Sequence, residues 1–477
     1  MERKLKKNLS YQTLYQLLTV VTPLIVTPYV SRILGSNNIG IYSYTYSIAY
    51  YFVMFSLLGV ANYGNRTMSI NNTSCENRSK TFWEIYSFQL FMTIIMTLIY
   101  LLYVIFCCDS EKIISLIQII YVSTSALDVS WLFFGLEDVK PVVIRNTIVK
   151  LMSLFGIFLF VKCSDDLWIY TILLNGGQFI GCATMWASLN KYIYFVKPSL
   201  KGIKKHIVPN IKLFIPVIAI SVYKTMDKIM LGSISTNSQV GFYTNAESLI
   251  NAPMGFIVAV GTVMLPRITN LLKNDEIEKS IIYFKKSLKL TMCFSCAVAF
   301  GLIAVAPTFV PLYYGNGFED CIFLIQGQAL VMLFLAWANV IRTQFLLPHQ
   351  HDKQYIYSII IGACVNVILN LVLIPNYAAA GALIATIFAE GTVCVIQSFD
   401  AAKYINIINC LYENSYFILS GIVMLIFIRL LDSYIHVSNI VLYLLFQILC
   451  GASIYILMLI IYYLFNTKIL KKQIYLK

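Results

Sequence analysis

The chain has 477 residues, of which 59% are hydrophobic and only 12% are charged. Soluble domains carry about 25% charged residues, so this composition excludes an ordinary soluble fold and predicts a protein whose solvent is the lipid bilayer. The net charge of +13 is concentrated in the connectors between hydrophobic segments. It therefore indicates membrane topology and attraction to anionic lipid, not nucleic-acid binding.

Hydrophobic segments long enough to cross a bilayer as helices follow one another along nearly the whole chain. About 20 residues are needed for each crossing, whereas barrel strands would show alternating segments of about ten residues. We predict an all-α polytopic membrane protein with about fourteen transmembrane helices. These helices are expected at residues 11–34, 41–64, 83–107, 113–135, 142–162, 167–189, 209–232, 239–262, 289–312, 321–347, 355–375, 378–399, 412–431 and 438–464.

Lysine and arginine accumulate in every second connector. Short connectors rich in these residues stay on the cytoplasmic side of a membrane, and this pattern places both termini of the multi-pass chain in the cytoplasm. The connectors assigned to the outer side hold few cations, namely Arg32, Lys112, Lys162 and Arg429.

A short motif occurs twice at equivalent places in two halves of the chain. Residues 39–42 read Ile-Gly-Ile-Tyr, and residues 240–243 read Val-Gly-Phe-Tyr. Because six predicted spans separate the copies, both enter the membrane from the same side and form a parallel repeat. We predict a six-helix lobe at 1–200, a second six-helix lobe at 201–405, and two additional helices with a basic tail at 406–477.

Several charged residues fall within predicted spans, where each ionised side chain costs about 2.5 to 3.5 kcal/mol at the bilayer centre. They must therefore face protein or a water-filled cavity. The candidates for binding a diphosphate in such a cavity are Arg32, Lys150, Lys224, Lys228, Asp128 and Asp227. A lysine supplies a point charge and an arginine a two-pronged donor.

The same charges also allow two other interpretations. Asp227 shares a helix face with Lys224 and Lys228, so these residues could form a structural ion pair. The acidic residues Asp128, Glu247 and Glu390 could instead couple transport to a proton or sodium gradient.

Three tyrosines, Tyr42, Tyr46 and Tyr50, recur every four residues and form one stripe on the second predicted span. Packing and interfacial anchoring would explain this stripe. Stacking and hydrogen bonding to sugar rings would explain it equally, and the pattern does not separate the two.

Motifs of catalysis and cofactor binding are missing. The sequence has no P-loop signature, and no connector is long enough to hold a catalytic domain. Most of the 12 cysteines lie in apolar spans without the spacing of metal ligands. We therefore expect no enzyme, no catalytic residue, no metal site and no cofactor apart from an ion gradient.

Three stretches together resemble the Wzx-type polysaccharide transporter family, the O-antigen and capsule repeat-unit flippases. They are Thr-Pro-Leu-Ile-Val-Thr-Pro-Tyr-Val-Ser-Arg-Ile-Leu-Gly at 22–35, Leu-Asp-Val-Ser-Trp-Leu-Phe-Phe-Gly-Leu-Glu at 127–137, and Met-Asp-Lys-Ile-Met-Leu-Gly at 226–232. The resemblance implies the MOP (MATE-like) exporter fold, with two six-helix lobes plus two helices. Family positions in a cationic central cavity would be Arg32, Asp128, Asp227 and Lys228.

The resemblance also implies a substrate and partners. The protein would move undecaprenyl-diphosphate-linked oligosaccharide from the cytoplasmic to the outer leaflet of the bacterial plasma (inner) membrane by alternating access. Its partners would be this lipid-linked oligosaccharide, membrane lipids, and polysaccharide polymerase and glycosyltransferases. The alternatives are an ion-coupled multidrug extruder, a lipid II flippase of the same superfamily, or a membrane scaffold for polysaccharide enzymes.

Overall fold

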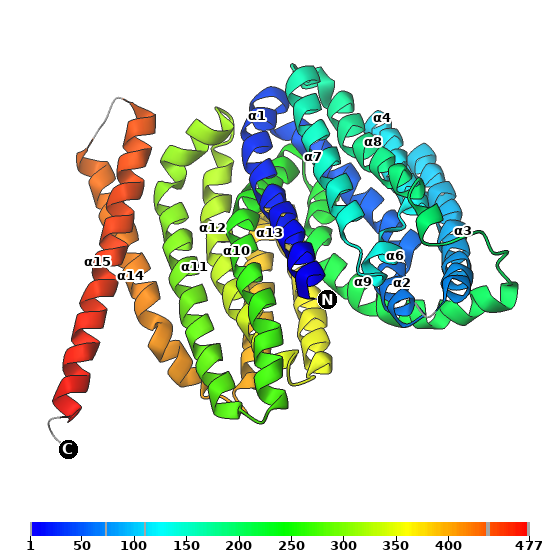
Figure 1. The fold of residues 1–477 in the computed structure, drawn as a ribbon. Helices are drawn as coiled ribbons and strands as arrows, with labels where there is room; N and C mark the ends of the chain where they lie inside the picture. The colour runs from blue at the N-terminus through cyan, green and yellow to red at the C-terminus, as the bar shows by residue number, and fades with distance from the viewer. Residues whose placement is uncertain (1, 72–73, 109–110, 436–438, 475–477) are drawn as a thin grey trace. The chain divides into compact units, whose positions relative to one another are not determined.

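The computed structural model describes residues 2–71, 74–108, 111–435 and 439–474, without the side chains of 2–17, 223–224 and 465–474. Within these ranges the chain consists of helices and connectors, with no β-strand (Figure 1). The prediction of an all-α fold is confirmed. A helix satisfies its own backbone hydrogen bonds, as a lipid environment requires.

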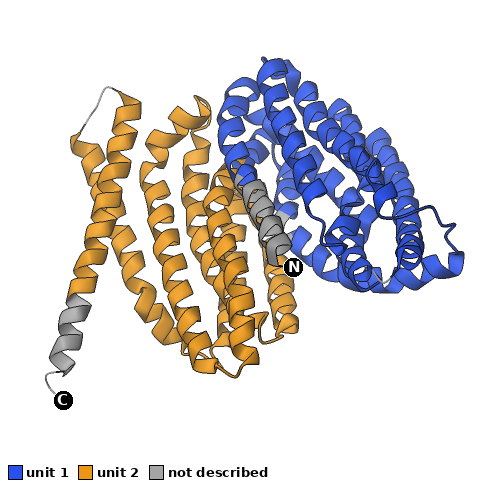
Figure 2. Ribbon diagram, viewed as in Figure 1, with its two compact units in different colours: residues 1–244 blue, residues 245–477 orange. Residues whose placement is uncertain are grey.

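The chain divides into two compact units, residues 1–244 and 245–477 (Figure 2). The first unit contains α1 (Glu2–Leu57), α2 (Val60–Ile70), α3 (Cys75–Cys107), α4 (Lys112–Ile117), α5 (Ile119–Leu127), α6 (Ser130–Gly135), α7 (Lys140–Phe160), α8 (Leu167–Trp186) and α9 (Leu200–Ile234). Short 3-10 turns, η1 (Ser164–Asp166) and η2 (Leu189–Lys191), flank α8. The predicted division at residues 200 and 405 stays a prediction.

The helix α10 (Asn237–Lys273) begins in the first unit and ends in the second. The second unit continues with α11 (Ile277–Tyr314), α12 (Asp320–Ile341), the π-helix η3 (Arg342–Leu346), α13 (Asp352–Ala401), α14 (Ile407–Tyr434) and α15 (Ile440–Ile474). Its core forms where α11 packs against α12 and α14, around residues such as Phe300, Trp337 and Phe417. The last two helices, α14 and α15, pack against each other and both contact α11.

Among the described residues, eleven helical stretches are long and apolar enough to cross a membrane. Two of them, Leu18–Ile70 with 53 residues and Asp352–Ala401 with 50 residues, each cover two predicted spans. Sharp kinks at Gly35 (φ 74°) and Ala378 (φ 46°) lie where the predicted spans are separated. The total of fourteen crossings stays a prediction.

One predicted span, at 113–135, is not a continuous helix. The structure divides it into α4, α5 and α6, with breaks at Gln118 and at Asp128–Val129. The predicted span is nevertheless confirmed as an apolar stretch, Lys112–Gly135, that is long enough to cross a membrane. Polar side chains explain the break at Asp128–Val129, because the Asp128 carboxylate and the Gln89 amide provide hydrogen bonds that a regular helix would otherwise make within its backbone.

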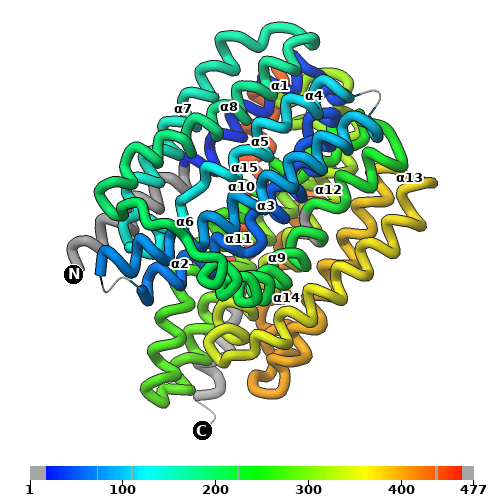
Figure 3. The backbone as a smooth tube through the Cα atoms, turned by 90° about the vertical axis from the view of Figure 1, so that its right-hand side faces the viewer, coloured from blue at the N-terminus to red at the C-terminus, as the bar shows by residue number. Residues whose placement is uncertain are grey.

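The first unit is organised around α1, which packs against α3, α5, α7 and α9. The helices α3 and α5 also lie side by side (Figure 3). Buried aromatic side chains such as Phe82, Trp131 and Phe133 form one core cluster of this unit. A second cluster surrounds Tyr100 and Tyr121.

The two repeated motifs meet in a reciprocal contact within the first unit. A Cβ atom added to Gly40 would lie 1.6 Å from the carbonyl oxygen of Asn237, and one added to Gly241 would lie 2.0 Å from that of Ser36. Each glycine of the repeat therefore rests on the backbone that precedes the other glycine. Only a residue without a side chain allows this close approach, which gives a physical reason for a glycine in both copies.

We predict that Gly241→Ala destabilises the protein, because the new methyl group would overlap the Ser36 carbonyl. Overpacking of this kind costs roughly 1–3 kcal/mol. The matched control is Gly391→Ala in α13, where an added Cβ meets nothing within 4 Å. Thermal unfolding of the purified proteins in detergent should show a lower Tm for Gly241→Ala only. Equal Tm values for both variants would contradict the close contact.

Candidate functional site

Asp128 lies in the break between α5 and α6. Its carboxylate accepts hydrogen bonds from the backbone N–H of Ser130, at 3.0 Å, and from the Ser130 hydroxyl. This is a local turn in which an aspartate side chain replaces a backbone acceptor. Asp128 therefore defines where α6 begins, a structural role that its position in a predicted span did not reveal.

Gln89 on α3 satisfies the backbone that this break exposes. Its fully buried side-chain amide donates to the carbonyls of Ser125 at 2.6 Å and Asp128 at 2.9 Å. Its carbonyl oxygen accepts from the indole N–H of Trp131 at 3.0 Å. One polar side chain thus supplies three hydrogen bonds where a buried polar group without a partner would be costly.

Arg145 on α7 is a cation beside the same break. Its guanidinium donates to the Asn146 side chain at 2.5 and 2.8 Å, to the Ser130 hydroxyl at 3.4 Å, and to the Cys182 sulfur at 3.5 Å. No carboxylate of the described residues forms an ion pair with it. Ser130 therefore links Arg145 to Asp128 through one hydroxyl group, and the guanidinium keeps donor capacity for an anion.

The predicted diphosphate-binding residues all belong to elements of the first unit. Arg32 is exposed on α1, Lys150 is half-buried on α7, and Lys228 is half-buried on α9. Asp227 is buried on α9 and accepts a hydrogen bond from the Tyr243 hydroxyl at 2.8 Å. The side chain of Lys224 lies outside the described residues, so its expected pairing with Asp227 stays a prediction.

Two hydrogen bonds fix α1 against the end of α7. The Tyr29 hydroxyl donates to the carbonyl of Val161 at 2.8 Å, and the Asn38 amide donates to the carbonyl of Ser164 at 2.7 Å. Arg32 lies between these two anchoring residues in sequence. The contact therefore positions the backbone of Arg32 relative to the helix that carries Lys150.

The predicted ion-coupling residues are separated by the division into units. Asp128 belongs to the first unit, whereas Glu247 on α10 and Glu390 on α13 belong to the second. Glu390 is buried and Glu247 is half-buried. Their role in ion coupling stays a prediction.

The tyrosine stripe packs within the first unit. The ring centroids of Tyr42 and Tyr46 are 5.7 Å apart, and Tyr46 stacks on Tyr121 at 4.8 Å. Tyr42 also meets Tyr170 edge to face at 5.0 Å. Tyr42 and Tyr46 therefore make packing contacts within this unit, and a contact with sugar stays a prediction for Tyr42, Tyr46 and Tyr50.

A hydrogen bond joins the connector after α6 to the connector after α8. The Tyr192 hydroxyl donates to the Asp138 carboxylate at 2.5 Å. Burial, this hydrogen bond and the charge of Asp138 raise the pKa of Tyr192 to about 12. The tyrosine therefore stays a neutral donor at physiological pH and holds the turn after α6 against the chain after α8.

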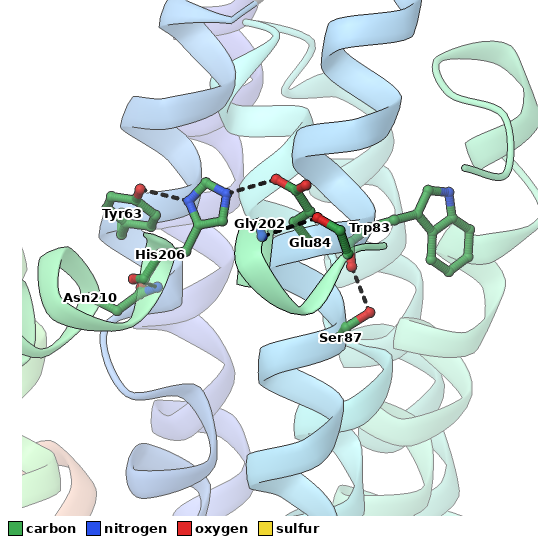
Figure 4. A network of polar contacts seen from close by, with 8 residues as sticks. Tyr63, Trp83, Glu84, Ser87, Gly202, His206 and Asn210 are labelled. Atoms are coloured by element: carbon green, nitrogen blue, oxygen red, sulfur yellow. Dashed lines mark hydrogen bonds and ion pairs between the residues drawn. The ribbon is translucent and has the colours of Figure 1, made fainter. Parts of the chain in front are cut away.

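Three polar residues of the first unit form a contact that the sequence reasoning missed. His206 on α9 lies between Tyr63 on α2 and Glu84 on α3 (Figure 4). The sequence feature that could have indicated this contact is Glu84, a carboxylate at the start of the predicted span 83–107. Its partners were not visible, because they are distant in sequence.

Long apolar helices with charged side chains inside them define a class of multi-pass membrane proteins to which transporters belong. The chain belongs to the family described as "Polysaccharide biosynthesis protein", whose model matches residues 5–272. A second model, described as "Lipid II flippase MurJ", matches residues 171–464. The predicted family is thereby confirmed, and the protein is a membrane transporter of the flippase type and not an enzyme.

Two relatives match most of the chain. Proteins named "Putative O-antigen transporter" from Escherichia coli (strain K12) and Shigella dysenteriae are 24% and 26% identical to it. The alignments cover 83% and 81% of this chain, and 95% and 97% of the relatives.

Solved structures confirm the predicted MOP/MATE-like fold class. The inward closed conformation of a lipid II flippase MurJ matches with a TM-score of 0.79 at 17% identity, covering 94% of this chain and 99% of the other. The inward-facing conformation of a multidrug resistance MATE family transporter matches with a TM-score of 0.59 at 11% identity, covering 87% and 95%. At these identities the likeness concerns the fold alone.

We predict that Gln89→Leu destabilises the break between α5 and α6. Two carbonyls and one indole N–H would lose their partner, and each buried polar group left unsatisfied costs about 1–3 kcal/mol. The control is Gln178→Leu on α8, an exposed glutamine without a hydrogen bond to a described residue. Thermal unfolding should show a clear loss of Tm for Gln89→Leu alone, and similar values for the two variants would refute the bridging role.

Proposed function

We propose that the protein is a flippase that moves undecaprenyl-diphosphate-linked oligosaccharide repeat units from the cytoplasmic to the outer leaflet of the bacterial plasma membrane. The products would serve O-antigen, capsule or exopolysaccharide synthesis. Membership of the polysaccharide biosynthesis protein family supports this proposal. So do two relatives, matched over nearly their full length, whose names refer to O-antigen transport.

The observation that carries the proposal is the set of cations on transmembrane helices of the first unit. In a bilayer such residues mark the path of a substrate or ion. Arg145 is the best defined of them, because its guanidinium is oriented by Asn146 and Ser130 and no described carboxylate neutralises it directly. Arg32, Lys150, Lys224 and Lys228 complete the proposed cationic cavity.

A diphosphate suits this set of residues for a chemical reason. It carries negative charge on several oxygens, which guanidinium groups bind in a bidentate manner and ammonium groups bind as point charges. The substrate charge would be neutralised during its passage through the membrane. Tyr42, Tyr46 and Tyr50 would offer aromatic faces and hydroxyls to the sugars.

Directional transport requires a driving force and an orientation. We propose alternating access of the cavity, with both chain termini in the cytoplasm as the distribution of lysine and arginine indicates. A proton or sodium gradient could act through Asp128, Glu247 or Glu390. Removal of the product by a polysaccharide polymerase could also draw the exchange forward, with glycosyltransferases supplying the substrate.

A lipid II flippase is the second candidate. The MurJ model matches residues 171–464, and a MurJ structure shares the fold. Lipid II also carries a diphosphate on a polyprenyl chain, so the same cations would serve it. The two functions differ in the glycan that is flipped, which a cellular experiment can distinguish. An ion-coupled multidrug extruder would instead handle substrates without a diphosphate.

We predict that Arg145→Gln and Lys150→Gln impair export at least tenfold. A hydrogen bond to a charged group contributes about 1.5–3 kcal/mol, which corresponds to roughly ten- to hundredfold in an equilibrium constant. Cells that depend on the variants should lose surface polysaccharide and accumulate lipid-linked repeat units on the cytoplasmic side. Arg32→Ala and Lys224→Ala should act in the same direction.

The matched control is Lys112→Gln, which removes an exposed cation at the start of α4. This variant should export normally. Normal export by the Arg145, Lys150, Arg32 and Lys224 variants together would contradict the cationic cavity. Rescue of a strain that lacks its lipid II flippase, without an effect on surface polysaccharide, would favour the second candidate.

A further inference from the structure

A proline interrupts the backbone hydrogen bonds of α11 in the second unit. Pro307 lies inside this helix and has no backbone N–H. The carbonyl of Ile303, four residues earlier, therefore lacks the partner that a regular helix would give it. The residues between them, at 304–306, are buried. A carbonyl without a partner is costly in an apolar environment, so donors from outside the helix must satisfy it.

Two side chains from two other helices donate to this carbonyl. The guanidinium of Arg429 on α14 donates to the Ile303 oxygen at 3.0 Å, and the side-chain amide of Gln326 on α12 donates to it at 3.2 Å. Both of these helices pack against α11 (Figure 1). Three helices of the second unit thus meet at the carbonyl that Pro307 leaves without its usual partner.

The guanidinium of Arg429 is also linked to the last helix, α15. Its Nη1 atom lies 3.8 Å from Oδ2 of Asp432, which is one turn further along α14. The other carboxylate oxygen, Oδ1, accepts hydrogen bonds from the Tyr443 hydroxyl and from the Gln447 side-chain amide, both at 2.6 Å. Tyr443 and Gln447 belong to α15. A chain of polar contacts therefore connects α15, through α14, to the break in α11.

Two glycines allow these helices to approach closely. A Cβ atom added to Gly421 of α14 would overlap the ring of Phe300 on α11, and one added to Gly451 of α15 would lie 2.8 Å from the Ile428 side chain on α14. Only a residue without a side chain permits such contacts. The pair α14–α15 is therefore packed tightly enough on α11 to hold the Arg429 side chain in place.

We propose that Arg429 is a positioning residue for transport, which ties the break in α11 at Pro307 to the helix pair α14–α15. A helix bends most easily where its ladder of hydrogen bonds is interrupted. The segment from Pro307 to the end of α11 at Tyr314 is about 10 Å long and lies toward the predicted outer side. A bend at Pro307 therefore moves the end of α11 on the side where the substrate is released.

The contact with the Ile303 carbonyl sets the geometry of this bend. While Arg429 donates to that oxygen, α11 keeps its present conformation, and separation of the two groups frees the outer segment to move. The role in transport rests on the proposed function. The contact of Arg429 with the carbonyl that Pro307 exposes does not.

A double-mutant cycle tests the contact. Pro307→Ala supplies the missing N–H, and the Ile303 carbonyl then has a partner within α11. Arg429→Met removes the donor and keeps a long, unbranched side chain. In thermal unfolding of the full-length protein in detergent, Arg429→Met should lower the Tm of the wild type, and that of Pro307→Ala by no more than about half as much. Equal losses in the two backgrounds would overturn the contact.

The matched control is Pro311→Ala, a second proline inside the same helix. It supplies an N–H for the carbonyl of residue 307 instead, so Arg429→Met should cost as much in this background as in the wild type. Gln326→Leu removes the other donor and should follow the same pattern as Arg429→Met. It provides the test if Arg429→Met does not fold.

Flipping rates test the role in transport. In vesicles at a temperature where every variant is folded, Arg429→Met should flip a lipid-diphosphate oligosaccharide about tenfold more slowly than the wild type. Arg429→Lys keeps a charged donor and should retain most of the rate. Pro307→Ala should also be slow, because its helix resists bending, and Arg429→Met should slow it no further.

Three outcomes would contradict parts of this account. A wild-type rate for Arg429→Met would overturn the positioning role, and so would an equal slowing by Arg429→Met in the wild-type and Pro307→Ala backgrounds. No flipping by the wild type, with the non-additive Tm values intact, would contradict the proposed function and with it the role in transport. The contact between Arg429 and the Ile303 carbonyl would then stand alone.

Discussion

The structure depends on one constraint: a polar group inside an apolar helix bundle must find its partner within the protein. The bilayer core offers no water to compensate a missing hydrogen bond. The break before α6 shows how the first unit meets this constraint, because Gln89 satisfies the exposed carbonyls and the Asp128 carboxylate accepts from Ser130. A break in a transmembrane helix is thereby stabilised at a fixed place, next to the cation Arg145.

The same constraint makes a charged side chain informative where the described residues provide no oppositely charged partner for it. Arg145 donates to uncharged side chains, and no carboxylate of the described residues forms an ion pair with it. The fold therefore retains a capacity to bind an anion at this cation.

Sequence alone predicted the features that depend on hydropathy and local motifs. The all-helical fold follows from the apolar segments, and the kinks at Gly35 and Ala378 fall where predicted spans separate. The repeated glycines were visible as a motif, but their reciprocal contact was not. The contact between Glu84 and His206 was also missed, since only folding brings these distant residues together. The break at Asp128 was hidden because the surrounding segment is apolar enough to be a continuous span.

The central claim is that cations on the transmembrane helices serve an anionic lipid headgroup. The most direct measurement compares two substrates in vesicles that contain the purified protein: a polyprenyl-diphosphate oligosaccharide, and an analogue in which a neutral linker replaces the diphosphate. The account predicts that the diphosphate substrate is flipped at least tenfold faster than the analogue and faster than in protein-free vesicles. Equal protein-dependent rates for the two substrates would contradict it.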